Sequence, residues 1–149
     1  MRAVIQKVSS SCVRVEGRIT GSIGKGFMVL LGISTMDTAE DLSYIEEKIS
    51  GLRIFEDNDG KMNLPLSDVG GEILVVSQFT LYGDARKGRR PSFIQAAKGP
   101  EAEALYEELL KRLRSRGFRV ETGEFGAMME VTIVNDGPVT ILLDSDKKF

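Results

Sequence analysis

The chain has 149 residues, with 20 lysines and arginines against 22 aspartates and glutamates, one cysteine, and neither histidine nor tryptophan. The absence of histidine excludes Ser-His-Asp and Cys-His triads and His-ligated zinc, and the lone Cys12 can form neither an internal disulfide nor a four-cysteine zinc site. A net charge of −2 argues against a surface built to hold long nucleic acid, although a small basic patch is compatible with it.

Length and composition predict a single domain over residues 1–149. Domains of about 100–150 residues are common, and 42% hydrophobic with 28% charged residues is ordinary for a globular protein. The first residues lack the apolar segment of a signal peptide, and the longest apolar run, residues 27–33, is far shorter than the roughly 20 residues that span a bilayer. We therefore expect a cytoplasmic protein with no membrane partner, a setting that suits a single cysteine.

The N-terminal third predicts a β-meander. Residues 1–8 and 12–15 alternate apolar and polar side chains, the period of half-buried strands. The dipeptide Glu16-Gly17 marks a tight turn into a strand over residues 18–23. A second turn then leads to the nearly continuous apolar segment 27–33, which we expect to be a central strand.

Two helices are predicted by capping signals and by apolar residues at helical spacing. The first begins near Thr38, and its apolar face comprises Leu42, Ile45, Ile49 and Leu52. The second begins at Gly99-Pro100 and ends at Gly117, and its apolar face comprises Leu105, Leu109, Leu110 and Leu113.

The remaining segments complete an α+β prediction. Residues 56–71 are rich in turn formers, residues 73–81 form an apolar strand with a polar insertion, and strand-like segments close the chain at 118–122, 128–134 and 139–143. We expect the last two to be joined by a turn at residues 135–138. Strands dominate this pattern, so it predicts one domain in which two principal helices pack on a sheet.

The first candidate site lies where the apolar strand becomes polar, at Ser77, Gln78, Phe79 and Thr80. A buried strand rarely continues into polar side chains unless the chain leaves the sheet or those groups find partners, and loops at strand ends often carry catalytic groups. Alternatively, Ser77 and Thr80 are turn hydroxyls bonded to neighbouring backbone. Spacing alone leaves both interpretations open.

The second candidate is the segment 135–140, which contains Asn135, Gly137, Pro138 and Thr140. Asx residues before Gly-Pro favour a tight turn, and a plain hairpin turn is the simplest interpretation. Because glycine lets other atoms approach the backbone closely, the segment can also serve a ligand.

The third candidate is a basic loop containing Arg86, Lys87, Arg89 and Arg90. Such a run is either a solvated face or a set of phosphate contacts for nucleic acid. The glycine-rich segment 21–26 lacks Walker A spacing, and the carboxylates at 56–59 and 144–146 do not continue as an EF-hand loop. We therefore expect no dedicated metal site.

Two segments together resemble the paired signatures of the D-aminoacyl-tRNA deacylase family: SQFTL at residues 77–81 and NDGPVT at residues 135–140. The opening MRAVIQKVSSSCVRVEGRITGSIGKG and the stretch GRRPSF are also similar to that family, so the likeness covers the whole chain. The resemblance implies a homodimer of compact, mainly antiparallel, β-barrel-like subunits with active sites at the subunit interface. It further implies hydrolysis of the ester between a D-amino acid and the 3′ adenosine of tRNA, a chiral proofreading step in translation quality control.

The resemblance also implies roles for the matching residues. The pocket around the ester and the terminal adenosine would be lined by Ser77, Gln78, Phe79 and Thr80. A Gly-cis-Pro element inserted from the partner subunit would inspect the chiral centre, and it would consist of Gly137 and Pro138 braced by Asn135 and Thr140. Phe79 matches the D-specific branch of the family.

The implied partners are the 3′ end of D-aminoacyl-tRNA, glycyl-tRNA(Ala) carrying mischarged glycine, and a second copy of the chain. We expect phosphate contacts with tRNA from the basic loop, namely Arg86, Lys87, Arg89 and Arg90. We expect neither a cofactor nor a DNA partner.

The chemistry expected of such a site does not need histidine. An aminoacyl ester is labile and its ribose has a vicinal 2′-hydroxyl, so orientation and backbone oxyanion donors suffice. Either Thr80 is a covalent nucleophile, or the substrate's hydroxyl assists hydrolysis beside backbone donors near Phe79. Thr80 has no imidazole to activate it, which favours the second mechanism. A non-enzymatic RNA-binding module and a general ester hydrolase are the competing interpretations.

Overall fold

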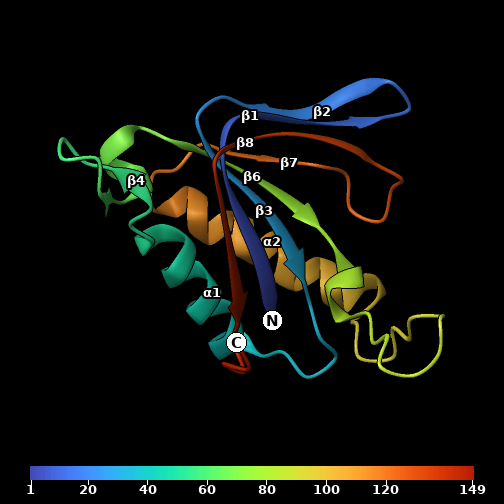
Figure 1. Ribbon diagram of the computed structural model, residues 1–149. Helices are drawn as coiled ribbons and strands as arrows, with labels where there is room; N and C mark the ends of the chain where they lie inside the picture. The colour runs from blue at the N-terminus through green and yellow to red at the C-terminus, as the bar shows by residue number, and fades with distance from the viewer.

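The computed structural model describes residues 1–149, and its two long helices lie against one face of a twisted sheet (Figure 1). The helices are α1 (Ala39–Gly51) and α2 (Gly99–Ser115), with short 3-10 helices η1 (Leu66–Val69) and η2 (Phe79–Tyr82). The main sheet comprises β1 (Arg2–Val15), β2 (Arg18–Ile23), β3 (Gly26–Gly32), β6 (Glu72–Ser77), β7 (Val120–Thr122) and β8 (Glu130–Asp144). A separate hairpin comprises β4 (Phe55–Glu56) and β5 (Met62–Leu64).

The main sheet is mixed, and it curls into a nearly closed barrel. Its strand order is β2-β1-β3-β6-β7, with β8 on the other edge of β1. Strand β1 pairs antiparallel with β2, β3 and β8, whereas β3–β6 and β6–β7 are parallel. Strand β2 approaches β7 so closely that a Cβ atom on Gly21 would lie 2.3 Å from the Thr122 carbonyl oxygen. This architecture confirms the α+β prediction of a barrel-like, mainly antiparallel sheet with two packed helices.

The segment predicted to be a central strand, β3, is buried on both faces. Its odd positions, Phe27, Val29 and Leu31, join the main core formed with the two helices. Its even position Met28 joins a smaller core on the opposite face of the sheet. The near-continuous apolar run is the sequence signature of such a two-sided position.

Both helices begin as their capping signals predict. The Thr38 amide donates to Asp41 Oδ2 at 2.8 Å at the start of α1, and Pro100 occupies the first turn of α2. The hydroxyl of Tyr106 donates to the Val75 carbonyl oxygen at 2.8 Å, which fastens α2 to β6. No helix of the structure combines the length and apolar character needed to cross a bilayer.

In two places, a pair of separately predicted strands forms one long strand in the structure, so the predicted strand boundaries were wrong there. Residues 2–8 and 12–15 both belong to β1, and residues 130–134 and 139–143 both belong to β8 instead of forming a hairpin. Both halves of β8 pair with β1: Asn135 faces Val8 and Thr140 faces Gln6. Five residue steps on β8 thus oppose two on β1, and the intervening residues form a bulge. Long-range pairing with β1 overrides the local turn preference of Asn-Asp-Gly-Pro.

Candidate active site

A cleft of about 550 Å³ opens beside the carboxyl end of β6. The first candidate segment lines it completely, with Ser77, Gln78, Phe79 and Thr80. The other walls come from the residues around the start of α2, from the loop between β7 and β8, and from the start of β8. They include Ala97, Lys98, Ala102, Phe125, Met129 and Val131. Ten of the 16 lining residues are hydrophobic, and the only ionisable side chain among them is Lys98.

The backbone at the mouth of this cleft is held by contacts with the neighbouring strand β3. The Gln78 amide donates to the Leu31 carbonyl oxygen at 2.7 Å, after which the chain leaves the sheet and enters η2. Helix η2 packs so tightly on β3 that a Cβ atom on Gly32 would lie 2.9 Å from Leu81 Cβ. The polar insertion therefore marks the point where the chain leaves the sheet, which agrees with the first of the two interpretations of this segment.

Helix η2 presents two backbone donors that the protein does not use. The first amides of a helix have no intrahelical acceptor. Neither Phe79 nor Thr80 donates its amide to a group elsewhere in the chain, and both residues line the cleft. Adjacent free amides of this kind can stabilise a developing oxyanion.

The side chains of the segment offer no proton acceptor stronger than an amide. The Thr80 hydroxyl is hydrogen-bonded to Gln78 Nε2, and no carboxylate or amine contacts it. The Phe79 ring is 48% exposed and packs edge-on against Phe93, with 5.2 Å between ring centroids. The ring can therefore cover one side of a ligand in the cleft.

The second candidate segment lies elsewhere on the chain. Gly137 and Pro138 occupy the exposed bulge of β8, joined by a cis peptide bond, and neither lines the cleft. In the sheet order, strands β1 and β3 lie between β8 and β6. The start of β8 reaches the cleft through Val131, whereas Gly137 and Pro138 lie farther along that strand and do not line it. One chain alone does not bring the two motifs together.

Side-chain amides hold this bulge. Asn135 Nδ2 donates to the carbonyl oxygens of Lys7 and Val139, each at 3.0 Å. Gln6 Nε2 donates to Thr140 Oγ1 at 3.2 Å. These bonds tie both ends of the bulge to β1.

Lys7 is a residue near the bulge that none of the sequence motifs indicated. Its side chain is only 2% exposed, with Nζ 2.7 Å from Glu56 Oε1 and 3.8 Å from Asp136 Oδ2. The hydrogen bond from Lys7 holds the pKa of Glu56 below its usual value. A signal was present in the sequence, because position 7 continues the inward alternation of Met1, Ala3 and Ile5 with a charged residue. Lys7 therefore links the β4–β5 hairpin to the β8 bulge.

The basic loop is exposed, and one of its cations is already paired. Arg86 binds Asp84 at 2.6 Å and holds the pKa of that carboxyl well below its usual range. Reciprocal hydrogen bonds between the backbones of Asp84 and Ser92 close the base of the loop. No carboxylate pairs with the remaining cations, Lys87, Arg89 and Arg90.

The carboxylate segments considered as cation sites have other partners. Asp57 accepts hydrogen bonds from the amides of Asp59 and Lys61, which shapes the β4–β5 turn. Asp144 accepts from Arg2 and from the Asp146 amide. The structure gathers no group of three or more His, Cys, Asp or Glu side chains that could hold a metal ion.

Arg2 connects η2 to the end of β8, and removing its guanidinium should destabilise the fold. Arg2 Nη1 donates to the Leu81 carbonyl oxygen at 2.9 Å, and Nε donates to Asp144 Oδ2 at 3.1 Å. Since Asp144 is 1% exposed, Arg2→Met leaves a buried carboxylate without its cation. We expect the free energy of unfolding in urea to fall by about 2–3 kcal/mol.

A double variant distinguishes this account from simple loss of packing. Arg2→Met combined with Asp144→Asn should cost clearly less than the sum of the two single changes, since neither then leaves a buried charge unpaired. Strictly additive costs in urea titrations would show that the ion pair is unimportant.

Comparison with known proteins gives consistent matches over nearly the whole chain. Residues 4–144 match the family model described as D-Tyr-tRNA(Tyr) deacylase. Proteins named D-aminoacyl-tRNA deacylase from Clostridium botulinum (strain Eklund 17B / Type B) and Clostridium beijerinckii are 62% and 63% identical, over 100% of both chains.

Solved structures agree in fold. A structure of the c-Myc DNA Unwinding Element Binding Protein is 44% identical, with a TM-score of 0.90 over 97% of this chain and 98% of that one. A structure described as a probable eukaryotic D-amino acid tRNA deacylase has a TM-score of 0.80 at 22% identity, over 95% of this chain and 97% of that one.

Proposed function

The chain belongs to the D-Tyr-tRNA(Tyr) deacylase family, and from that premise we propose how it hydrolyses the ester of D-aminoacyl-tRNA. The reaction takes place in the cleft beside η2, with Ser77, Gln78, Phe79 and Thr80 around the terminal adenosine and the ester. The observation that carries this proposal is the pair of free amides, those of Phe79 and Thr80, on a cleft whose only ionisable lining residue is Lys98.

The chemistry follows from these donors and from the substrate. Water adds to the ester carbonyl carbon, and the two amides stabilise the negative charge that develops on the carbonyl oxygen. The bond to the ribose 3′ oxygen then breaks, and the vicinal 2′-hydroxyl passes a proton to that oxygen while accepting one from the attacking water. The products are free amino acid and tRNA with an intact 3′-hydroxyl. No side chain has to act as a base.

The active unit of the proposal is a homodimer. Gly137 and Pro138 are exposed and do not line the cleft of their own chain, so the proposal places them at the cleft of a second copy. The outer edge of β8 is unpaired and carries the exposed apolar side chains of Val134 and Leu142. A long edge strand of this kind is a surface on which a second copy can dock.

In the dimer, the bulge would act as the chiral filter. Carbonyl oxygens of Gly137 and Pro138 accept hydrogen bonds from the substrate amine, while the same backbone leaves no room for an L side chain. Rejection by steric clash admits glycine, which has no side chain, and so extends the substrates to glycine mischarged on alanine tRNA. Asn135 and Thr140 keep the bulge in place through their bonds to β1.

Contact with the body of tRNA is limited in this proposal, because the chain carries a net charge of −2. The negative net charge also disfavours binding to DNA, although the 44% identical relative is named for binding a DNA element. The reaction belongs in the cytoplasm, where charged tRNA is used.

Removing the unpaired cations of the basic loop should weaken tRNA binding. We expect the triple change Lys87→Ala, Arg89→Ala, Arg90→Ala to raise the Kd for tRNA about tenfold at 0.1 M salt and to flatten its salt dependence. Arg86→Ala is the matched control, since Arg86 is paired with Asp84 and should contribute little. Unchanged affinity of the triple variant, measured by filter binding, would mean that the loop is only a solvated face.

A three-substrate assay tests the proposed function against its competitors. Purified protein is incubated with D-Tyr-tRNA, with L-Tyr-tRNA and with a simple ester such as p-nitrophenyl acetate. Rapid cleavage of the D-aminoacyl-tRNA alone is the expected result. Cleavage regardless of chirality would indicate a general ester hydrolase, and binding without cleavage would indicate an RNA-binding module.

A further inference from the structure

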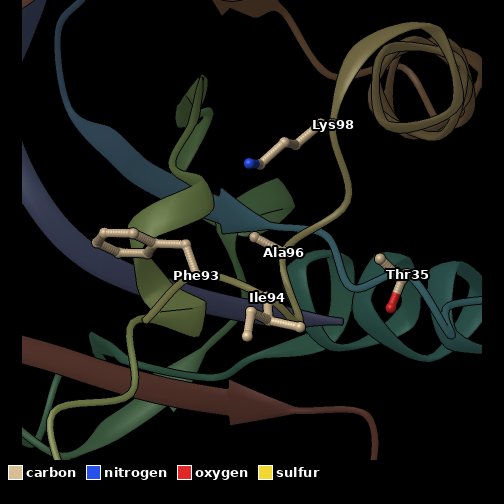
Figure 2. Close-up of a pocket in the computed structure, with 5 residues that line it drawn as sticks. All are labelled: Thr35, Phe93, Ile94, Ala96 and Lys98. Carbon is tan, nitrogen blue, oxygen red and sulfur yellow. The ribbon is translucent and has the colours of Figure 1, made fainter. Parts of the chain in front are cut away.

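A second hollow adjoins the cleft and is not used by the proposed reaction. It has a volume of about 470 Å³ and is lined by Thr35, Phe93, Ile94, Ala96 and Lys98 (Figure 2). Lys98 lines both spaces, and Phe93 packs against Phe79 of the cleft. The hollow therefore borders the site that would hold the terminal adenosine.

The backbone under the hollow is firmly attached to the sheet. The Thr35 amide donates to the Gln95 carbonyl oxygen at 3.0 Å, and the Ala97 amide donates to the Ile33 carbonyl oxygen at 2.8 Å. Ala96 and Ala97 are buried beneath the surface. These bonds make the segment an extension of β3, so it presents its side chains from a fixed base.

The side chains on this base combine apolar surface with positive charge. Ile94 is 87% exposed, an unusual position for a large apolar residue next to a cleft. Figure 2 shows the Lys98 side chain extending away from α2, and no carboxylate pairs with its ammonium group. The unpaired cations of the basic loop precede Phe93 in the same connection. Proteins commonly bind single-stranded nucleic acid on aromatic side chains flanked by cations, and Phe93 is the aromatic residue of this hollow.

We propose that this hollow binds the unpaired nucleotides that precede the terminal adenosine of tRNA. The base next to that adenosine rests on Phe93 and Ile94, and Lys98 binds the phosphate that links the two nucleotides. This inference rests on the proposed function, which puts the terminal adenosine in the adjoining cleft. The shared residue Lys98 sits where that linking phosphate has to pass between the two spaces.

Binding of a short RNA tests the surface without requiring catalysis. The probe is a 5′-fluorescein-labelled single-stranded RNA ending in CCA, titrated by anisotropy with the intact protein. Ile94→Ser should raise its Kd about tenfold through loss of apolar surface buried against the base. Lys98→Ala should also weaken binding and reduce the slope of log Kd against log salt by about 0.7, the value for one phosphate contact on a single strand.

Matched control variants test whether the loss of any exposed isoleucine or lysine, away from the hollow, would weaken RNA binding. Ile19→Ser changes another exposed isoleucine, on β2, and Lys61→Ala removes an exposed charge on the β4–β5 hairpin. Both should leave the Kd unchanged. A Kd and salt slope equal to wild type in Ile94→Ser and Lys98→Ala would overturn the proposal, as would tight binding of an apolar acidic peptide in place of RNA.

A minimal substrate separates failure of this inference from failure of the proposed function. D-tyrosyl-adenosine lacks the preceding nucleotides and occupies the cleft alone. If wild type cleaves it while Ile94→Ser binds CCA-ended RNA normally, the deacylase function stands and the hollow is not an RNA surface. If wild type cleaves neither this substrate nor intact D-Tyr-tRNA but the RNA titration gives the expected losses, the hollow binds RNA and the proposed chemistry is wrong.

Discussion

Replacing the 2′-hydroxyl of the terminal adenosine with hydrogen is expected to lower kcat for D-aminoacyl-tRNA by about a thousandfold. The cleft provides two free backbone amides at Phe79 and Thr80 but no ionisable group except Lys98. In the proposed mechanism the proton for the leaving 3′ oxygen comes from the substrate, and a positioned proton donor contributes about 10² to 10⁴ in rate. The measurement is single-turnover hydrolysis of tRNA ending in 2′-deoxyadenosine, aminoacylated at its 3′-hydroxyl.

The companion variant is Thr80→Ala, for which we expect kcat within about threefold of wild type. The Thr80 hydroxyl contacts only Gln78 Nε2 and has no base to activate it as a nucleophile. The alanine variant keeps the backbone amide of residue 80, so oxyanion stabilisation is preserved. A severe loss in Thr80→Ala, together with full turnover of the deoxy substrate, would establish covalent catalysis by Thr80 instead.

Gly137→Ala is expected to reduce deacylation of D-Tyr-tRNA at least about a hundredfold, since a misplaced substrate-positioning group can cost that much. Gly137 has φ of +124°, a conformation that L residues rarely adopt, and an added Cβ would lie 2.8 Å from Val139 Cγ2 and 3.1 Å from the Val139 amide nitrogen. Val139 is buried and cannot easily move aside. The bulge must therefore change shape, at a cost of about 1–3 kcal/mol in stability.

Gly60→Ala is the control for backbone strain alone. Gly60 has φ of +75° but open space around its added Cβ, and it lies on the β4–β5 turn away from the cleft. The Gly60→Ala protein should be somewhat less stable than wild type and should keep full deacylase activity. Normal D-specific turnover by folded Gly137→Ala protein, with circular dichroism reporting the fold, would remove the bulge from the mechanism.

Much of the fold was predictable from the sequence, because the spacing of apolar residues and the helix-capping residues determine secondary structure through near neighbours in the chain. Thr38 caps α1, and α2 begins at Gly99-Pro100, as the capping signals indicate. The apolar run at residues 27–33 corresponds to β3, which is buried on both faces. The segment 135–138 was predicted wrongly as a hairpin turn. Its turn chemistry is real, but pairing on both sides with β1 makes it a bulge within one strand.

The candidate site was only half visible in the sequence. The polar residues after the buried strand did mark the cleft, since they lie where β6 ends. The opposite wall, with Ala97, Ala102 and Phe125, consists of small and apolar residues that are indistinguishable from core residues until the chain is folded. Lys7 gave a usable signal, a charge at an inward strand position, but its partners Glu56 and Asp136 are distant in sequence.

The central claim is that one subunit supplies the cleft and its partner supplies the bulge, and subunit mixing tests it directly. Gly137→Ala damages the bulge, while Ala127→Trp fills the cleft from a loop that lines it. The two variants are co-expressed with different tags, and the mixed dimer is isolated by sequential affinity steps.

Each parental homodimer should be inactive on D-Tyr-tRNA. The mixed dimer contains one intact cleft facing one intact bulge, so it should recover about half of the wild-type rate per dimer, as one of two equivalent sites. A mixed dimer as inactive as its parents would contradict the account, because it would mean that cleft and bulge act within the same chain.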